Sequence, residues 1–275
     1  MARRGVDLSE MNGSVDFPAL KAAGVEFVII RCGYGGDFVH QDDARFRENV
    51  EKADDAGMPW GAYLYSYAKD VSMARDEAQH TLRLLNGRKP AYGVWYDVED
   101  AQQAGCDLVS ICEAYCTAIE KAGCYCGIYS MLSWLNGKLN SSRLDKYDKW
   151  VADWDTSCGY QKPYGMWQYT DRLMIGGRAF DGNLAYLDYP ALTAGRPDSP
   201  HTEKEDGEMT YEQFRAFAQR YEEERGKAAE SGWSRQEGYW KKATELGVTD
   251  GSRPRGFCAR EELAAMLGRL GLLRG

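Results

Sequence analysis

The sequence lacks long apolar runs. No stretch of about 18 consecutive apolar residues occurs in this 275-residue chain, so we expect no membrane-spanning helix. Arg3 and Arg4 stand near the start without an apolar segment behind them, and we therefore expect no signal peptide. A chain of this kind is expected to be made in the cytoplasm.

Long stretches of basic residues are also absent. The formal net charge is -8 and no Lys/Arg stripe occurs, which argues against nucleic acid as the main partner. Residues 209–275 carry 12 Lys+Arg and 10 Asp+Glu, which leaves 22 and 32 for residues 1–208. An acidic body followed by a nearly neutral tail indicates two structural units.

Cysteine spacing typical of a metal site is missing. Four of the eight cysteines lie between residues 112 and 126, but their spacing fits no standard zinc pattern and no histidine is near. Cys112 and Cys116 are one helical turn apart, where small apolar side chains are ordinary. Without a secretion signal, we expect reduced thiols and no bound metal.

What the sequence does have is an alternation of strand and helix patterns. Such alternation is typical of a mostly parallel sheet with helices outside it. Because no helix is predicted between the last three strands, we expect an α/β fold with a modified, irregular (β/α) barrel. Strands are predicted at 4–8, 25–31, 60–67, 94–99, 125–129, 149–152, 166–169 and near 178–181, and helices at 17–23, 42–56, 71–85 and 108–122.

The rest of the sequence predicts a small α-helical C-terminal domain. Residues 194–208 have the composition of a linker between a barrel domain at 1–193 and a second domain at 209–275. Three short helices are indicated there by capping boxes, a helix-ending glycine and an apolar stripe: Thr210 with Gln213, Ser234 with Glu237, Gly247, and Leu263 with Met266, Leu267 and Leu270. A unit of about 65 residues is marginal alone, so we expect it to oligomerise or to pack on another surface.

Acidic residues stand where apolar strand patterns end. Asp97 and Glu99 are two residues apart at the end of the strand predicted at 94–99, so they share one face of it. Asp7 and Asp181 follow the first and last predicted strands, which are neighbours in a closed barrel. In barrel enzymes the C-terminal strand ends carry the catalytic groups. The sequence therefore predicts four carboxylates around one mouth.

Four carboxylates at one rim allow two kinds of chemistry. Mutual repulsion and partial burial raise the pKa of at least one of them. A neutral acid beside an ionised carboxylate is what glycoside cleavage needs. The same oxygen-rich rim also suits a hard cation such as Mg²⁺. Topology alone leaves both readings open.

Short motifs follow one another between about residues 5 and 190. They include Gly5-Val6-Asp7-Leu8-Ser9, Phe27-Val28-Ile29-Ile30-Arg31, Tyr63-Leu64-Tyr65-Ser66, Tyr96-Asp97-Val98-Glu99, Gly127-Ile128-Tyr129-Ser130, Trp167-Gln168-Tyr169 and Asp181-Gly182-Asn183. In these motifs and their order the chain resembles the glycoside hydrolase family 25 muramidases, the Chalaropsis-type lysozymes that are common among phage endolysins.

The resemblance implies hydrolysis of the β-1,4 bond between N-acetylmuramic acid and N-acetylglucosamine in peptidoglycan. Glu99 matches the family's proton donor. Asp97 matches its partner, either a nucleophile or the stabiliser of an oxazolinium formed by the substrate's 2-acetamido group. Asp7 and Asp181 match two further carboxylates of the pocket. The residues that would line the sugar groove are Tyr34, Tyr63, Tyr65, Trp167 and Gln168.

Each assignment has a structural alternative. Asp7 could cap a turn and Asp181 could open an Asp-Gly turn, while the aromatic residues could be loop or core side chains. His40, His80 and His201 match no catalytic position, and we place them in a loop, on a helix surface and in the linker. We therefore expect no histidine-based mechanism.

The resemblance also implies an enzyme that acts on bacterial peptidoglycan and needs no cofactor. We expect a phage or prophage endolysin, made in the host cytoplasm and acting on the wall after release through another protein's pore. The tail resembles an S-layer-homology unit, but one repeat stands where such units come as three. We therefore expect either wall binding or homo-oligomerisation. The alternatives are a non-catalytic peptidoglycan-binding barrel and a metal-dependent hydrolase.

Overall fold

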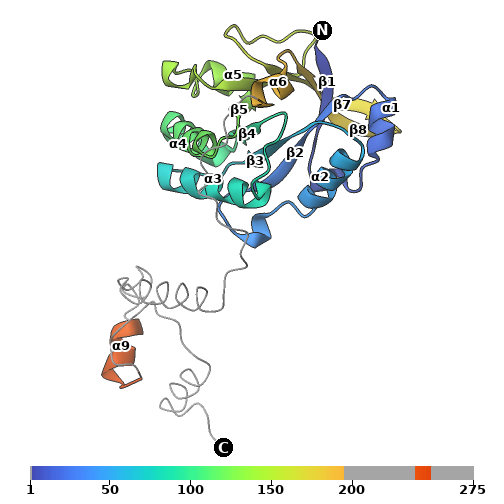
Figure 1. Ribbon diagram of the computed structural model, residues 1–275. Helices are drawn as coiled ribbons and strands as arrows, with labels where there is room; N and C mark the ends of the chain where they lie inside the picture. Colours follow the sequence, from blue (N-terminus) through green and yellow to red (C-terminus); the bar gives the residue numbers. More distant parts are fainter. Residues whose placement is uncertain (1, 195–238, 249–275) are drawn as a thin grey trace, which may run out of the picture. The chain divides into compact units, whose positions relative to one another are not determined.

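Eight strands form one closed barrel in chain order (Figure 1). They are β1 (Arg3–Leu8), β2 (Phe27–Tyr34), β3 (Trp60–Tyr65), β4 (Val94–Asp97), β5 (Cys126–Met131), β6 (Asp148–Ala152), β7 (Met166–Ile175) and β8 (Arg178–Ala185). Neighbours from β1 to β7 are parallel, whereas β8 is antiparallel to both β7 and β1. The predicted α/β fold with an irregular barrel is confirmed.

The computed structural model describes residues 2–194 and 239–248. Contacts divide the chain into two compact units, Met1–His201 and Thr202–Gly275, and each is described by itself.

In the second unit the described part is the helix α9 (Tyr239–Glu245) and the residues that follow it. Gly247 adopts the left-handed region at φ 65° and ends the helix, as the sequence predicts. The predicted linker, most of the C-terminal helices and the S-layer-like pattern lie outside the described residues.

Helices cover the outside of the barrel (Figure 1). They are α1 (Phe17–Ala22), α2 (Phe46–Asp55), α3 (Val71–Leu85), α4 (Leu108–Lys121), α5 (Leu132–Asn136) and α6 (Tyr189–Ala194). Aspartates begin the two long ones: Asp70 accepts from the Met73 amide at 2.9 Å, and Asp107 accepts from the Ser110 amide at 3.1 Å. The last three strands follow one another without an α-helix between them.

Side chains along each strand point alternately outward and into the barrel, and this produces two hydrophobic cores. Outward residues such as Val28 pack against the helices, and inward residues such as Phe27 and Trp95 fill the barrel. Phe27 stacks on Tyr92 with ring centroids 4.2 Å apart. A Cβ at Gly127 would lie 2.3 Å from the Trp95 ring, so glycine makes room for an interior aromatic. The barrel is therefore a filled core below the level of the acids.

Two strand boundaries differ from the prediction and affect the acids. β4 ends at Asp97, so Glu99 lies beyond the strand rather than on it. β7 and β8 form a hairpin through Gly176 and Gly177, whose φ values are 57° and 79°. Two successive left-handed residues form the tight turn that suits the strand twist. Asp181 consequently lies within β8 and not after it.

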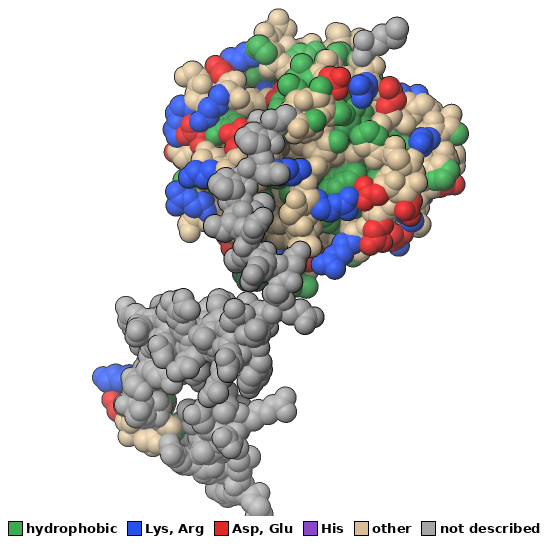
Figure 2. All heavy atoms as spheres, in the orientation of Figure 1, with side chains coloured by type: hydrophobic (Ala, Val, Ile, Leu, Met, Phe, Trp, Pro, Cys, Tyr) green, Lys and Arg blue, Asp and Glu red, His purple; other side chains and the backbone are tan. Residues whose placement is uncertain are grey.

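On the visible face of the barrel unit, acidic and basic side chains are interspersed with apolar ones (Figure 2). Within the described part of the chain, no helix has the length and apolar character needed to cross a membrane.

Candidate active site

Barrel closure brings Asp7 and Asp181 side by side at the mouth, the end at which the parallel strands terminate. The two residues are directly opposite each other in the antiparallel pairing of β1 with β8. The predicted neighbourhood of the two acids is confirmed. Both lie within strands, so neither is explained as a turn residue.

Asp7 is buried, and two amides hold one of its oxygens. Gln168 Nε2 donates to Oδ2 at 2.9 Å and Asn183 Nδ2 donates to it at 2.8 Å. Burial and the charge of Asp181 raise the pKa of Asp7 well above its ordinary value, although the two amides work against this. Burial also raises the pKa of Asp181. The pair therefore keeps a proton more readily than an isolated aspartate does.

Asp97 ends β4 on the inward-facing side of the strand. It is 4% exposed, and its Oδ1 has no hydrogen-bond partner among the described residues. Burial, followed by the charges of Glu99 and Asp7, raises the pKa of Asp97 well above its ordinary value, while Arg31 works in the opposite direction. Burying a polar atom without a partner is costly, so this oxygen contributes nothing to stability and is available to a ligand.

Glu99 is half-buried and completes the cluster. Burial, followed by the charge of Asp181, raises the pKa of Glu99. Because Asp97 is influenced by both Glu99 and Asp7, the four carboxylates form one electrostatic unit. Like charges this close do not all ionise together, so the cluster keeps protons at a higher pH than its members would alone.

Three of the predicted sugar-binding aromatics share the mouth with the acids. Burial and the charges of Asp7 and Asp97 raise the pKa of the Tyr63 hydroxyl well above its ordinary value. Tyr65 is half-buried, and burial and the charge of Asp97 raise its pKa as well. Tyr34 is the register partner of Tyr65 on the neighbouring strand. Tyr63 and Tyr65 therefore lie beside the carboxylates, with Tyr63 also packed against the barrel core, and Tyr34 lies next to Tyr65 in the strand pairing.

Trp167 and Gln168 are consecutive on β7 and therefore face opposite sides of the strand. Gln168 faces the interior, where it holds Asp7, and its Oε1 accepts from the Tyr129 hydroxyl at 3.1 Å and from Trp154 Nε1 at 3.0 Å. Trp167 is 6% exposed and donates to a backbone carbonyl at 2.7 Å. Gln168 thus supports Asp7, and the Trp167 indole is anchored to the backbone; a role of either side chain in sugar binding stays a prediction.

Sequence reasoning missed two residues that contact this cluster. Tyr129 is buried, and burial and the charges of Glu99, Asp97 and Asp7 raise the pKa of its hydroxyl well above the ordinary value. Asn183 binds Asp7, as described above. Strand alternation could have found both residues, because Tyr129 is the register partner of Asp97 and Asn183 follows Asp181 by two positions.

The cysteines and histidines singled out in the sequence lie in other parts of the described structure. No group of three or more His, Cys, Asp or Glu side chains there is arranged to hold a metal ion. Cys112 and Cys116 are buried in the apolar core under α4. His40 lies in a short 3-10 helix, Val39–Gln41. The prediction that His80 lies on a helix surface is wrong, because its ring is fully buried on α3.

The sequence model of the glycosyl hydrolases family 25 matches residues 6–178, a stretch that holds Asp7, Asp97 and Glu99. The chain belongs to glycosyl hydrolase family 25. In this family 25 member, the fourth carboxylate, Asp181, comes just after the matched stretch and is brought to the others by the β7–β8 hairpin.

Named relatives of this family 25 member include lytic enzymes. The autolytic lysozyme of Clostridium acetobutylicum is 26% identical over 198 residues, which are 70% of this chain and 58% of that protein. The modular autolysin LytC from Streptococcus pneumoniae, solved with a synthetic peptidoglycan ligand, is 28% identical with a TM-score of 0.61, over 67% of this chain and 47% of that one. The catalytic domain of endolysin ply40 from bacteriophage P40 of Listeria monocytogenes is 25% identical with a TM-score of 0.60, over 71% and 98%. The chain therefore spans about half the length of the first two.

Proposed function

We propose that the protein is a peptidoglycan hydrolase, an N-acetylmuramidase that cleaves the β-1,4 bond between N-acetylmuramic acid and N-acetylglucosamine. The observation that carries this proposal is the cluster of Asp7, Asp97, Glu99 and Asp181 at the barrel mouth. Burial raises the pKa of each carboxyl, and like charge within the cluster raises it further for Asp7, Asp97 and Glu99. A carboxyl group that keeps its proton beside an ionised partner supplies both groups that glycoside cleavage needs. The lysozyme and autolysin relatives support the same class of substrate.

Glu99 is the general acid in this proposal. It is the more exposed member of the Asp97–Glu99 pair and so the one that a substrate oxygen can reach. As the glycosidic C–O bond breaks, the proton moves from Glu99 to the leaving oxygen and positive charge develops at the anomeric carbon. Asp97 Oδ1, which has no partner among the described residues, is available to that carbon or to the 2-acetamido group.

The remaining mouth residues orient this pair. Asp7 is fixed by Gln168 and Asn183, and it acts on Asp97 through its charge. Tyr63 and Tyr65 present flat rings with polar hydroxyls beside the acids, and side chains of this kind suit a sugar that has apolar faces and polar edges. We assign them, with Tyr34, to sugar binding.

Mass spectrometry of digested peptidoglycan tests the proposed bond. Wild type is expected to release fragments with reducing-end N-acetylmuramic acid, and Glu99→Gln to lower the rate by about 100- to 10,000-fold because the proton donor is lost. Asp100→Asn is the matched control, since Asp100 is the adjacent acid and caps the next turn through the Gln102 amide. It should release the same products at a rate close to that of wild type.

Other product patterns would replace the proposal. Reducing-end N-acetylglucosamine would make the protein a glucosaminidase on the same scaffold. Binding without cleavage of any wall tested would favour the non-catalytic barrel. Loss of activity in EDTA, restored by Mg²⁺, would favour a metal-dependent hydrolase.

We further propose a phage or prophage endolysin that is made in the host cytoplasm and reaches the wall through a pore. The likeness to the P40 endolysin domain supports this origin. Expression of the full chain in a bacterial cytoplasm should lyse cells only when a pore-forming protein is made with it.

We also keep the domain organisation that the sequence predicts: a barrel at 1–193, a linker at 194–208, and a C-terminal domain at 209–275 that binds wall or forms homo-oligomers. Wall co-sedimentation and sedimentation equilibrium of the full chain distinguish these two roles.

A further inference from the structure

Tyr34 is followed by a loop at the barrel mouth, residues 35–42, which we call the β2–α2 loop. The loop begins at Gly35, whose φ is 62°. The Gly35 amide donates to the Tyr65 carbonyl oxygen on β3 at 2.9 Å. The Tyr34 hydroxyl donates to the His40 carbonyl oxygen, within the loop, at 3.2 Å. Phe38 and Val39 at its tip are 56% and 78% exposed. The position of Tyr34 therefore depends on how this loop is held.

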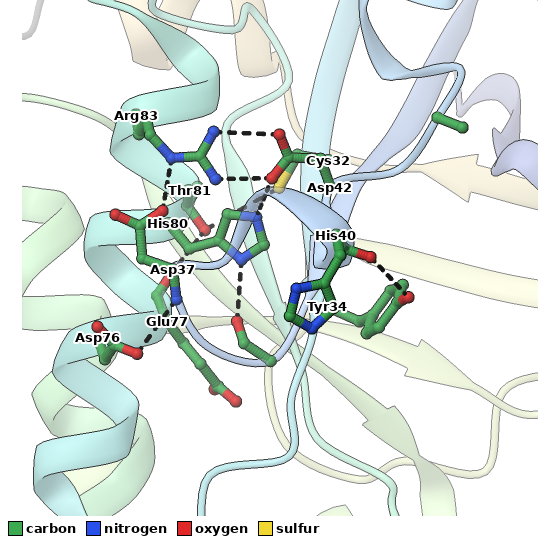
Figure 3. Close-up of polar contacts among 12 residues, drawn as sticks. Cys32, Tyr34, Asp37, His40, Asp42, Asp76, Glu77, His80, Thr81 and Arg83 are labelled. Atoms are coloured by element: carbon green, nitrogen blue, oxygen red, sulfur yellow. Dashed lines mark hydrogen bonds and ion pairs between the residues drawn. The ribbon is translucent and has the colours of Figure 1, made fainter. Parts of the chain in front are cut away.

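His80 on α3 binds the loop from its buried side (Figure 3). Nδ1 lies 3.0 Å from the Gly35 carbonyl oxygen, and Nε2 lies 2.9 Å from Asp42 Oδ1. A carbonyl can only accept. Arg83 donates to both oxygens of Asp42, at 3.1 and 2.6 Å. Burial acts to raise the pKa of Asp42, but the hydrogen bonds and charges of Arg83 and His80 lower it overall, so Asp42 is an ionised acceptor.

Both ring nitrogens of His80 thus face acceptors, and each needs a hydrogen to form its bond. We propose that His80 is held as an imidazolium and is a positioning residue for substrate binding, because it fixes the β2–α2 loop and with it Tyr34 at the barrel mouth. The inference rests on the proposed function, which gives Tyr34 its role. A neutral imidazole has one N–H, so loss of the proton would remove one of the two anchors.

Two further carboxylates belong to the hydrogen-bond network next to the ring. Asp37 accepts from Arg83 Nε at 2.5 Å, and Asp76 accepts from the Asp37 amide at 3.1 Å. Two carboxylates, those of Asp37 and Asp42, therefore contact the one guanidinium group of Arg83 (Figure 3). An imidazolium at His80 supplies the second positive charge.

The other titratable groups near the ring form no hydrogen bond with His80, because each is neutral or has another partner. Burial raises the pKa of the Cys32 thiol to about 12, so the thiol is neutral, and its sulfur contacts Thr81. Glu77, one turn earlier on α3, accepts from two hydroxyl groups at 2.9 and 2.6 Å. Asp43 directs its carboxylate to Arg31 at 2.8 Å.

Gly33 shows how closely the ring is enclosed. A Cβ at this position would lie 2.7 Å from His80 Cε1 and 2.7 Å from the Gln41 carbonyl oxygen. No side chain fits between the strand and the ring. The imidazole is therefore fully buried and packed against β2, and its protonation decides whether both bonds exist.

Nitrogen-15 NMR of the histidine rings tests the protonation directly. The full chain has three histidines, so His40→Gln and His201→Gln variants assign the signals. We expect the His80 ring to carry a hydrogen on both nitrogens in the pH range where the enzyme binds its substrate. A His80 ring with one N–H throughout that range would overturn the inference, whether or not the protein cleaves peptidoglycan.

Kinetics on soluble peptidoglycan fragments test the positioning role. His80→Gln is neutral at every pH and should raise KM about tenfold with kcat within about twofold, the size expected when one hydrogen bond is lost. In wild type, KM should rise over the same pH interval in which NMR shows His80 losing its proton, and this rise should be absent in His80→Gln. His201→Gln is the control for the loss of a histidine, because His201 lies outside the β2–α2 loop.

The outcomes are separable. A pH profile of KM that is the same in wild type and His80→Gln would overturn the positioning role. If His80→Gln does not fold, comparison of the wild-type NMR titration with its KM profile decides, since a mismatch between the two overturns it. Absence of cleavage by wild type, with His80 doubly protonated, would count against the proposed function and not against the imidazolium.

Discussion

Each end of the barrel has an aspartate among tyrosines, and the two aspartates differ in their hydrogen bonds. At the closed end, Asp148 begins β6 and accepts from the Tyr189 hydroxyl at 2.6 Å, the Tyr125 hydroxyl at 3.0 Å and the Lys149 amide at 2.7 Å. At the mouth, Asp97 ends β4 with Oδ1 lacking any partner among the described residues. One carboxylate is satisfied by the fold, and the other is left for a ligand.

The surroundings of the two acids explain the difference. Tyr189 from α6 packs against the rings of Tyr92, Trp95 and Tyr125 at the N-terminal ends of the strands, with centroids 5.4 to 5.7 Å apart. That end is therefore a continuation of the core. The mouth instead gathers like charges, which destabilise the folded state. An acid that stabilises the fold and an acid that serves chemistry can thus be told apart by their hydrogen bonds.

The same substitution at both ends should have opposite consequences, and the largest is expected at the mouth. Asp97→Asn should lower the rate of peptidoglycan cleavage by at least about 100-fold, because the charge that faces the developing cation is lost. It should not lower stability, since it removes a buried charge that is repelled by its neighbours. Initial rates and urea denaturation of the full chain measure the two effects.

A result in which Asp97→Asn unfolds more easily than wild type would make Asp97 a structural acid like Asp148. Retained activity would assign the partner role to Asp7 or Asp181 instead.

At the closed end, Asp148→Asn should cost about 1–3 kcal/mol of the free energy of unfolding, because an amide nitrogen cannot accept a hydrogen bond. The rate per folded molecule should stay close to that of wild type. Urea denaturation followed by active-site-normalised rates would measure both. Tyr189→Phe, which removes one donor and keeps the ring, should show a smaller loss of the same kind. A loss of rate without a loss of stability would break the comparison.

Much of this barrel follows from the sequence. Apolar runs bounded by glycine and aspartate caps predict α1 to α4 and most strands within a few residues, and closure of the barrel places Asp7 opposite Asp181. The short helices α5 and α6 were not predicted, and β7 continues to Ile175, well past its predicted end at residue 169. Strand periodicity is a local property, and the acids at the strand ends are visible in it. What the sequence reveals best is therefore the set of elements and the rim on which they converge.

Side-chain partnerships were harder to predict, because they join residues far apart in the chain. Gln168 reaches Asp7 across 161 positions, and nothing local distinguishes an amide that binds substrate from one that holds an acid. His80 lies on a helix whose polar pattern suggests a surface, yet the β2–α2 loop covers it. The hairpin through Gly176 and Gly177 did carry a local signal, since paired glycines between strand patterns predict a tight turn.

The smallest expected effect concerns stability against pH. The pKa of Asp97 is raised in the folded protein by burial and by Glu99 and Asp7, so between its ordinary value and the raised one the folded state binds more protons than the unfolded state. The free energy of unfolding therefore falls as pH rises through that window, by at most about 1.4 kcal/mol per pH unit for one group. In Asp97→Asn the free energy of unfolding should fall less as pH rises. The stability of the variant relative to wild type should therefore increase from about pH 4 upward.

A carboxylate with the opposite shift provides the control. Asp107 caps α4, and hydrogen bonds from the Ser110 hydroxyl and amide lower its pKa. The contribution of Asp107 to the free energy of unfolding is present above the ordinary pKa of aspartate and is lost as pH falls through the lowered pKa. The stability of wild type relative to Asp107→Asn should therefore increase as pH rises. Urea denaturation across acidic to neutral pH would compare the three proteins. If the free energy of unfolding depends on pH in the same way for wild type and Asp97→Asn, the pKa of Asp97 is not raised in the folded protein. The contrast between the two ends of the barrel would then lose its electrostatic basis.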